Sequence, residues 1–466
     1  MSQQFDVVII GGGPVGILLA NLLGQRGLSV CLCEKRQAPY PLPRAIHFDG
    51  EVMRVFQSAG LAEAVLPHTH VGVGMLFQDG NGKTLIDWSR DQTIGPMGWY
   101  ESYRFFQPGL EAVLREGLDR FAHVTRRDGC AVTALSQTED AVTLTLASGE
   151  VAEAAYAVGC DGAQSFTRQA LGIALEDLGF NERWLVVDAK LKRPRPDLGD
   201  HSIQFCDPEY PATYVRGTKD WRRWEMRVEA DREEISDAEI WQLLARWITP
   251  EDATLERAAL YTFRSTLAQE WQMGRVFLAG DAAHQMPPFM GQGMCAGVRD
   301  VANLAWKLAA VFGGQDVLAS YGSERAKNLR DFIEMTMRLG RLINQTAAGD
   351  APSGNMKSIW PSLGAGLGPR DGVAGGLGPQ LIEGETRSDD LSLSGFTMLV
   401  KSPLQGALQD DTGWLAERDL AAALIRPDGY VLDTVPAGGN PATLQSRYAA
   451  LIEALPDRLG LPASRT

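Results

Sequence analysis

Three scarcities in this 466-residue sequence exclude several classes of protein. Only six cysteines are present, and none has the CxxC spacing or another spacing typical of a metal site or a disulfide oxidoreductase. No run approaches the roughly 20 apolar residues that span a bilayer. Basic residues are outnumbered, 44 Lys and Arg against 58 Asp and Glu, and the net charge of −14 would repel the phosphates of a nucleic acid.

The scattered cysteines indicate a reducing compartment. Cys31 and Cys33 alternate within a predicted strand, so we expect both side chains on one face as buried free thiols. No signal peptide is visible before the first predicted strand. We therefore expect a cytoplasmic protein without a metal site and without nucleic-acid or membrane partners. The number of subunits stays open, with a homodimer as one possibility.

The sequence does contain a βαβ pattern at its start. Residues 5–10 (FDVVII) form a short apolar run typical of a buried parallel strand. Residues 17–27 have helical apolar spacing, and residues 28–34 (LSVCLCE) form a second predicted strand. The unit predicts a parallel sheet covered by helices.

A glycine-rich turn joins the first strand to the helix. Gly11, Gly13 and Gly16 form a GxGxxG motif, which permits a tight turn, close approach of a pyrophosphate and close helix–strand packing. Glu34 ends the second strand about 20 residues later, where a carboxylate can hold ribose hydroxyls. In this context the motif predicts dinucleotide binding.

Two later segments also carry chemistry. Asp281 ends the apolar run RVFLAGD and precedes H..P…GQGM, so it can accept a hydrogen bond from a ribityl hydroxyl, or simply cap a helix. The second segment, Asp161-Gly162 followed by Ser165 and Arg168, is by itself an ordinary strand-to-helix turn. The order of the three segments is more informative than any one of them.

That order resembles the class A flavoprotein aromatic hydroxylases, which are built like p-hydroxybenzoate hydroxylase. The resemblance covers about residues 1–345 in order and spacing. Residues 43–46 (PRAI), 65–69 (VLPHT), Gln107 and 297–309 (GVRDVANLAWKLA) are most similar to the 3-(3-hydroxyphenyl)propionate hydroxylase branch.

The resemblance implies a cofactor and a reaction. FAD would be the cofactor, NADH or NADPH the co-substrate, and a small phenolic substrate would be hydroxylated with O₂ through a flavin C4a-hydroperoxide. Only one dinucleotide motif is present, so the nicotinamide would bind transiently. A related epoxidase or halogenase, and an FAD-binding module without catalysis, stay open as alternatives.

The resemblance also implies a set of cofactor-binding positions. They are Gly11, Gly13, Pro14, Gly16, Glu34, Lys35, Arg44, Gln107, Asp161, Asp281, Pro287, Gly291, Gly293 and Met294. Arg44 and Gln107 would contact the ribityl and phosphate side of FAD. One departure is Cys295, where the family usually has Asn after GQGM, so only a backbone contact to the flavin is expected there.

The implied architecture is an α/β fold with a Rossmann-like FAD-binding domain, an interleaved and mostly antiparallel substrate-domain sheet, and a small C-terminal α/β appendage. The predicted segments are 1–71, 105–180 and 269–345 for FAD binding, 72–104 and 181–268 for substrate, 346–392 as a linker, and 393–466 as a thioredoxin-like remnant without redox cysteines. Within that remnant we predict a helix near residues 415–425.

Hydroxylation requires activation of the phenol, whose unperturbed pKa is about 10. A base or a hydrogen-bonding group must favour the phenolate, and the candidates are His47, Asp49 and Tyr214, with Arg216 as a source of positive field. His284, after the GD motif, is expected to have a structural role rather than a catalytic one.

Four residues are candidates for contact with the substrate. Arg216 and Arg223 could pair with a substrate carboxylate, although both could equally be ordinary arginines at a strand edge. Pro288 and Phe289 are expected to line the substrate site. The aromatic residues between 205 and 224 are compatible with a pocket wall or with an ordinary core.

Overall fold

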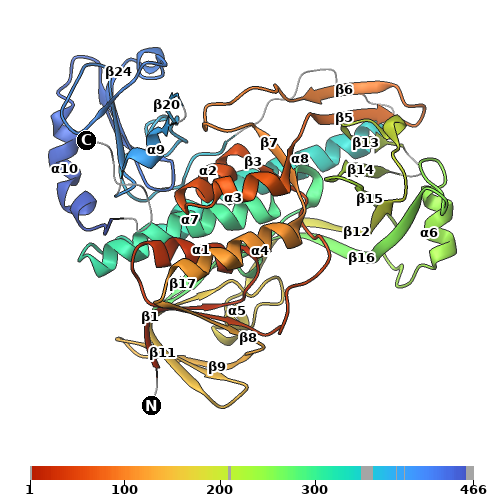
Figure 1. Cartoon of the computed structure of the whole chain (residues 1–466), viewed down its shortest axis with the longest axis horizontal. Helices are drawn as coiled ribbons and strands as arrows, with labels where there is room; N and C mark the ends of the chain where they lie inside the picture. The colour runs from red at the N-terminus through yellow and green to blue at the C-terminus, as the bar shows by residue number, and fades with distance from the viewer. Residues whose placement is uncertain (1–2, 208–210, 348–359, 385, 393, 458–466) are drawn as a thin grey trace.

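The computed structural model describes residues 3–207, 211–347, 360–384, 386–392 and 394–457. A parallel sheet with its helices occupies the centre and bottom of the view in Figure 1, a large antiparallel sheet the right, and a small C-terminal unit the left. None of the helices in these ranges combines the length and apolar character needed to cross a membrane. The interleaved α/β architecture predicted from the sequence is confirmed.

The first sheet has the order β17-β18-β11-β1-β2-β8, and every pairing along it is parallel except that of β17 with β18. Strands β9 and β10 extend it as an antiparallel hairpin beside β11. The strands are β1 (Gln3–Ile10), β2 (Val30–Glu34), β8 (Val124–Asp128), β9 (Val132–Gln137), β10 (Val142–Leu146), β11 (Val151–Gly159), β17 (Gln272–Met273) and β18 (Val276–Leu278). Because both faces are covered, the central strands read as unbroken apolar runs.

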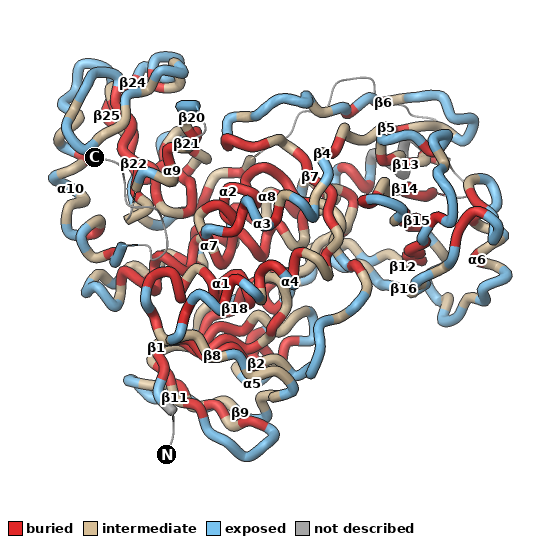
Figure 2. The backbone as a smooth tube through the Cα atoms, viewed as in Figure 1, coloured by how far each residue is buried: buried red, intermediate tan, exposed pale blue. Residues whose placement is uncertain are grey.

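Helices cover this sheet and form the main core with it. They are α1 (Pro14–Gln25), α2 (Gly50–Ser58), α3 (Ala62–Val65), α4 (Gln107–Gly117), α5 (Phe166–Ala170), α7 (Gly293–Phe312) and α8 (Ser320–Ala347). Figure 2 shows the buried residues concentrated where α1, α2 and α7 pack together. Cys31 and Cys33 of β2 are free and buried with their sulfurs 3.8 Å apart, so the expected pair of thiols on one face is confirmed.

The second sheet has the order β19-β16-β12-β15-β14-β13-β5-β6, and only the pairing of β13 with β5 is parallel. Its strands are β5 (Gly74–Asp79), β6 (Thr84–Ser89), β12 (Leu175–Leu191), β13 (Ser202–Cys206), β14 (Ala212–Arg216), β15 (Trp221–Arg227), β16 (Ala253–Ala268) and β19 (His284–Gln285). Helix α6 (Asp237–Leu244) covers one face, where Trp224 and Tyr214 are buried. A three-stranded sheet of β3 (His47–Asp49), β7 (Ser102–Phe105) and β4 (Thr69–Val71) lies between the two units.

The C-terminal unit is a four-stranded sheet with the order β23-β22-β24-β25 and one longer helix. Its elements are β22 (Thr397–Val400), β23 (Leu408–Gln409), β24 (Leu420–Ile425), β25 (Val431–Pro436) and α10 (Ala442–Glu453). The helix predicted near residues 415–425 is wrong, since a short 3₁₀ turn (Ala416–Arg418) leads directly into β24. The alanines and leucines of this segment favour a helix locally, but they are buried between two neighbouring strands. The likeness of this unit to thioredoxin stays a prediction.

The described part of the predicted linker is packed against the body of the protein. Arg54 of α2 donates to the carbonyl of Gly378 at 2.7 Å and pairs with Asp389 at 2.6 Å. This stretch includes β20 (Ile382–Glu383), β21 (Thr386–Arg387) and α9 (Ser388–Leu391). Residues 348–359 of the predicted linker lie outside the described residues.

Candidate functional site

A cavity of about 1020 Å³ lies between the carboxyl ends of the parallel strands and one face of the antiparallel sheet. The parallel strands contribute the residues that follow β1, β2, β11 and β18, and the antiparallel sheet contributes side chains of β12, β14 and β15. The carboxyl edge of a parallel sheet is where α/β proteins bind ligands. The volume is sufficient for a dinucleotide and a small second ligand.

The glycine turn at one end of the cavity has no room for side chains at Gly11 and Gly16, whereas Gly13 has open space beside it. A Cβ on Gly11, whose φ is +109°, would lie 2.4 Å from the carbonyl oxygen of Cys160, and one on Gly16 would lie 2.0 Å from the carbonyl oxygen of Gly11. The amide of Gly12 donates to Glu34 at 2.6 Å. Helix α1 begins here without a side-chain cap and without an acidic residue in its first turn, so its amides face the cavity as an anion site.

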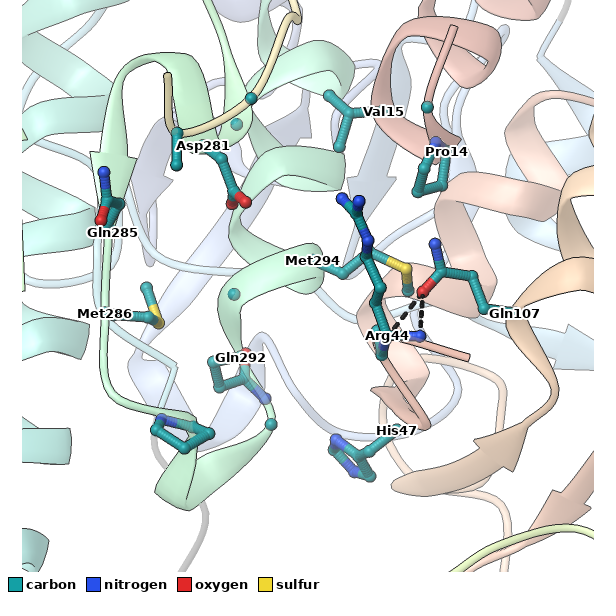
Figure 3. Close-up of a pocket in the computed structure, with 18 of the residues that line it drawn as sticks. Pro14, Val15, Arg44, His47, Gln107, Asp281, Gln285, Met286, Gln292 and Met294 are labelled. Atoms are coloured by element: carbon teal, nitrogen blue, oxygen red, sulfur yellow. Dashed lines mark hydrogen bonds between the residues drawn. The ribbon is translucent and has the colours of Figure 1, made fainter. Parts of the chain in front are cut away.

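Asp281 supplies the test of whether FAD fits this site. Its side chain is exposed to the cavity, and within the described ranges no hydrogen bond reaches its carboxylate. Burial by the surrounding protein raises the pKa of Asp281, and the positive charge of Arg44 only partly opposes this. Figure 3 shows Asp281 and Arg44 projecting from different segments into the same space. A polyhydroxylated chain would supply the missing donors, so the residues present fit the ribityl part of FAD.

The loop that carries Arg44 is held in place from two sides. The side-chain oxygen of Gln107 accepts hydrogen bonds from the amides of Arg44 and Ala45 at 3.0 and 2.7 Å (Figure 3). Arg223 donates to the carbonyl of Arg44 at 2.6 Å and pairs with Asp188 at 2.7 Å. Gln107 and Arg223 therefore fix the backbone from which Arg44 enters the cavity. Arg223 also lines the cavity, and its predicted pairing with a substrate carboxylate stays a prediction.

His47 lies on the cavity wall beside the GQGM loop. Its Nε2 is 3.2 Å from the hydroxyl of Ser102. Burial lowers the pKa of His47 to about 4, although the carboxylate of Asp49 opposes the shift, so the imidazole is neutral near pH 7. Gly291 has a φ of +63°, and a Cβ there would lie 3.0 Å from Nδ1 of His47. The loop thus approaches His47 closely because position 291 is glycine.

Asp49 also lines the cavity, but its carboxylate is already engaged. It caps α2 by accepting from the amide of Val52 at 3.1 Å, and it accepts from Gln292 at 3.1 Å and from Arg299. Burial opposes ionisation, yet Arg299 holds the pKa of Asp49 below its usual value. These contacts indicate that Asp49 fixes the loop at position 292 rather than acting as a base for the substrate.

Tyr214 and Arg216 lie away from the cavity. In β14 the alternating residues Thr213 and Val215 face the cavity, which directs their neighbours to the other side of the sheet. Tyr214 is buried there with its ring 5.3 Å from that of Trp224, and Arg216 pairs with Asp200 at 3.2 Å. The structure brings neither residue to the candidate site.

The remaining predicted residues divide into two groups. Those that line the cavity are Gly11, Gly13, Pro14, Glu34, Lys35, Asp161, Pro288, Phe289, Gly291, Gly293 and Met294. One oxygen of Asp161 accepts from Thr167 at 2.8 Å, and its other, buried oxygen has no partner among the residues that the structure describes. Gly16 and Pro287 are not among the lining residues, and Pro287 is the N-cap of the 3₁₀ turn Pro288–Met290. His284 pairs with Asp300 at 2.7 Å, in agreement with the expected structural role.

Many residues of the cavity wall were missed from the sequence, among them Ser102, Thr213 and Glu225. Glu225 follows Arg223 by two positions, so strand alternation could have placed both on one face once β15 was recognised. No sequence pattern marks Ser102, because its approach to His47 depends on the pairing of β3 with β7.

Comparisons with known proteins agree with this geometry. The family profile described as an FAD binding domain matches residues 4–336. A probable NADH-specific resorcinol 4-hydroxylase of Rhodococcus jostii is 36% identical, with 99% of this chain and 98% of that protein aligned. A 3-(3-hydroxy-phenyl)propionate/3-hydroxycinnamic acid hydroxylase of Mycobacterium avium is 38% identical, but the match covers 74% of this chain and only 62% of the relative.

A solved structure extends the likeness to the whole fold. The flavin-dependent monooxygenase PieE, crystallised with FAD and substrate, superposes with a TM-score of 0.80 at 20% identity over 97% of this chain and 99% of its own. At that identity the likeness concerns the fold alone. It includes the C-terminal unit, since nearly the whole of both chains is aligned.

Proposed function

Because the chain belongs to the FAD-binding-domain family of flavin-dependent aromatic hydroxylases, we propose that it hydroxylates a small dihydroxybenzene of the resorcinol class with NADH and O₂. The observation that carries the substrate class is the end-to-end match to the resorcinol hydroxylase, which leaves almost none of either chain unaligned. The matches to hydroxyphenylpropionate hydroxylases omit more than a third of those proteins. We propose NADH as the co-substrate because the same relative is described as NADH-specific.

The cofactor would lie along the cavity from the glycine turn to the GQGM loop. When bound, FAD supplies hydride acceptance from the nicotinamide and activation of O₂. Glu34 would hold the ribose, the amides of α1 the pyrophosphate, and Asp281 the ribityl hydroxyls. Arg44, fixed by Gln107, would place its positive charge beside the phosphate and ribityl groups.

His47 is the residue that we propose acts on the reacting phenol. A neutral imidazole accepts a hydrogen bond from a phenol and so orients it; a pKa of about 4 keeps His47 neutral in the physiological range and makes it too weak a base to hold the phenol's proton. Ser102, at 3.2 Å, holds the ring orientation. Phe263 and Phe289 line the same wall and would exclude water from the reacting ring.

The test is NADH oxidation measured with a panel of phenols, with hydroxylated product and hydrogen peroxide quantified together. We expect resorcinol to accelerate NADH oxidation and to yield hydroxylated product in near-equal amount, and NADPH to be used more slowly. The same rate of NADH oxidation with and without every phenol would contradict the proposal. A binding protein without catalysis would keep oxidised, yellow FAD after NADH is added.

Two expectations from the sequence stay predictions. One is the cytoplasmic location, and the other is the homodimer. Gel filtration with light scattering would measure the mass of the assembly in solution, and a mass of about twice that of the chain would support the dimer.

A further inference from the structure

The side of the cavity formed by the antiparallel sheet contains a carboxyl group to which the proposed reaction assigns no role. Glu225 of β15 lines the cavity together with Val186 and Thr213. The strand register places Val186 of β12 and Thr213 of β14 directly opposite Glu225 on its two sides. All three residues are buried, so together they form one continuous surface of the sheet facing the cavity.

Glu225 lacks the partners that buried carboxylates usually have. Its nearest cation is Arg223, 3.7 Å away, and no hydrogen bond to its carboxyl group occurs in the part of the chain that the structure describes. The guanidinium of Arg223 is already bound to Asp188 and to the carbonyls of Pro43 and Arg44. Burial raises the pKa of Glu225 against the opposing charge of Arg223. A buried polar group of this kind is costly unless a ligand completes its hydrogen bonds.

Two arginines that line the cavity already face carboxylates of the protein. Arg257 pairs with Asp188 at 2.7 Å, and Arg90 stacks over Trp88 and lies 3.8 Å from the carboxylate of Glu101. Arg104 donates to the backbone carbonyl of Asp200 at 2.6 Å and keeps its positive charge. At Glu225 itself a hydroxyl group can donate a hydrogen bond, whereas a substrate carboxylate would lie against a like charge.

We infer that Glu225 is a specificity-determining residue, which accepts a hydrogen bond from the second hydroxyl of a dihydroxybenzene while His47 contacts the hydroxyl at the reacting side. The inference rests on the proposed function and goes further, because it names the group that selects resorcinol over phenol and over arylpropionates. Val186 and Thr213 complete a flat, uncharged surface for the edge of the ring.

The experiment compares wild-type protein with Glu225→Gln and Glu225→Leu, all loaded with FAD. Dissociation constants for resorcinol, phenol and 3-(3-hydroxyphenyl)propionate come from the change in flavin absorbance on titration, so turnover is not required. In Glu225→Leu we expect resorcinol to bind about 10- to 100-fold more weakly, with phenol changed by less than about threefold. Glu225→Gln, which keeps the shape and the hydrogen bond, should bind the propionate more tightly than wild type does.

Glu256→Leu is the matched control, because Glu256 is an exposed glutamate of β16 in the same sheet. Unchanged preference for resorcinol over phenol in both Glu225 variants would overturn the inference. So would a wild-type protein that binds the two phenols equally. A loss of preference in Glu225→Leu without hydroxylated product from wild type would instead support the binding role of Glu225 and refute the proposed reaction.

Discussion

Two groups of buried charges in this molecule differ in whether the protein satisfies them. Behind the cavity, between α7, α8 and the C-terminal sheet, Glu324 accepts from Lys307 at 2.7 Å and from Arg426 at 2.9 Å, and Arg426 also pairs with Asp428. Burial would raise the pKa of Glu324, but the two cations outweigh it and hold the pKa well below its usual value. Lys307, Glu324 and Arg426 are all buried, and burial lowers the pKa of Lys307 to about 7 although Glu324 opposes the shift.

The polar residues in the cavity show the opposite arrangement. Among the described residues, no donor reaches the carboxylate of Asp281 or the second oxygen of Asp161, and the nearest cation to Glu225 is Arg223 at 3.7 Å. Burial raises the pKa of Asp281 and of Glu225, and the neighbouring positive charges offset this only in part. The comparison teaches that satisfied charges hold units of this fold together, and unsatisfied ones mark where ligands bind.

The largest expected effect comes from breaking the satisfied group. Glu324→Leu leaves Lys307 and Arg426 buried without their shared acceptor, which should lower the free energy of unfolding by about 3–5 kcal/mol. Urea denaturation followed by circular dichroism measures it. Glu334→Leu, an exposed change on the same helix, is the control and should stay within about 0.5 kcal/mol of wild type. Equal stability of the two variants would mean that the buried carboxylate of Glu324 does not stabilise the fold.

The next effect tests the unsatisfied group. Asp281→Ala should bind FAD at least about 100-fold more weakly, because the ribityl hydroxyls lose a charged acceptor. The apoprotein should melt at the wild-type temperature or slightly above it, since an uncompensated carboxylate has been removed. Flavin fluorescence titration and a melting curve of the apoprotein measure the two quantities. Full FAD occupancy in the variant would refute the assignment of Asp281 to the ribityl chain.

A smaller effect is expected where the two groups meet. The hydroxyl of Tyr430 in the C-terminal unit donates to Glu51 at 2.9 Å, and Glu51 pairs with Arg299 at 2.6 Å. Arg299 in turn contacts Asp49 and Gln292 at the cavity wall. Tyr430→Phe removes one donor from a carboxylate that keeps its cation, so we expect a loss of about 1–2 kcal/mol in stability. Tyr448→Phe is the comparison at a half-buried position of the same unit: its hydroxyl also donates to a carboxylate, that of Asp433, at 3.0 Å, and its removal should cost less. The urea midpoint is again the measurement.

The smallest effect concerns pH. The folded pKa of His47 is about 4, below the ordinary 6.5, so between these values the unfolded chain binds a proton that the folded chain does not. Stability from this group is therefore present above pH 6.5 and is lost as the pH falls toward 4. His47→Gln should reduce the stability difference between pH 6.5 and 4 by up to about 1 kcal/mol, allowing for water in the cavity. An unchanged difference would mean that His47 is not buried as described.

Much of the fold was accessible from the sequence because its signals are local. The glycine turn, the apolar strands at residues 5–10 and 28–34, and the long helices have patterns that depend on nearby residues only. The segment 415–425 was misjudged because its alanines and leucines suit a helix or a buried strand, and only its strand neighbours decide between them.

The candidate site was accessible in part for the same reason. Positions that belong to a motif, such as Gly11, Asp281 and Met294, do line the cavity, and their contacts with FAD stay a prediction. Tyr214 and Glu225 could not be assigned without knowing which face of β14 and β15 meets the cavity, which depends on pairing with strands distant in the sequence. The engagement of Arg223 by Asp188 is likewise a product of tertiary structure.

The order of the parallel strands has a consequence for how the chain acquires its structure. Val8, Ala157 and Val276 stand next to one another on β1, β11 and β18, so the sheet joins segments that are synthesised far apart in time. The chain must close very long loops before these pairings can stabilise it, and such a topology slows folding. While synthesis continues, the edge of β11 stays open for other chains, and chaperone assistance becomes most valuable before residue 278 emerges from the ribosome.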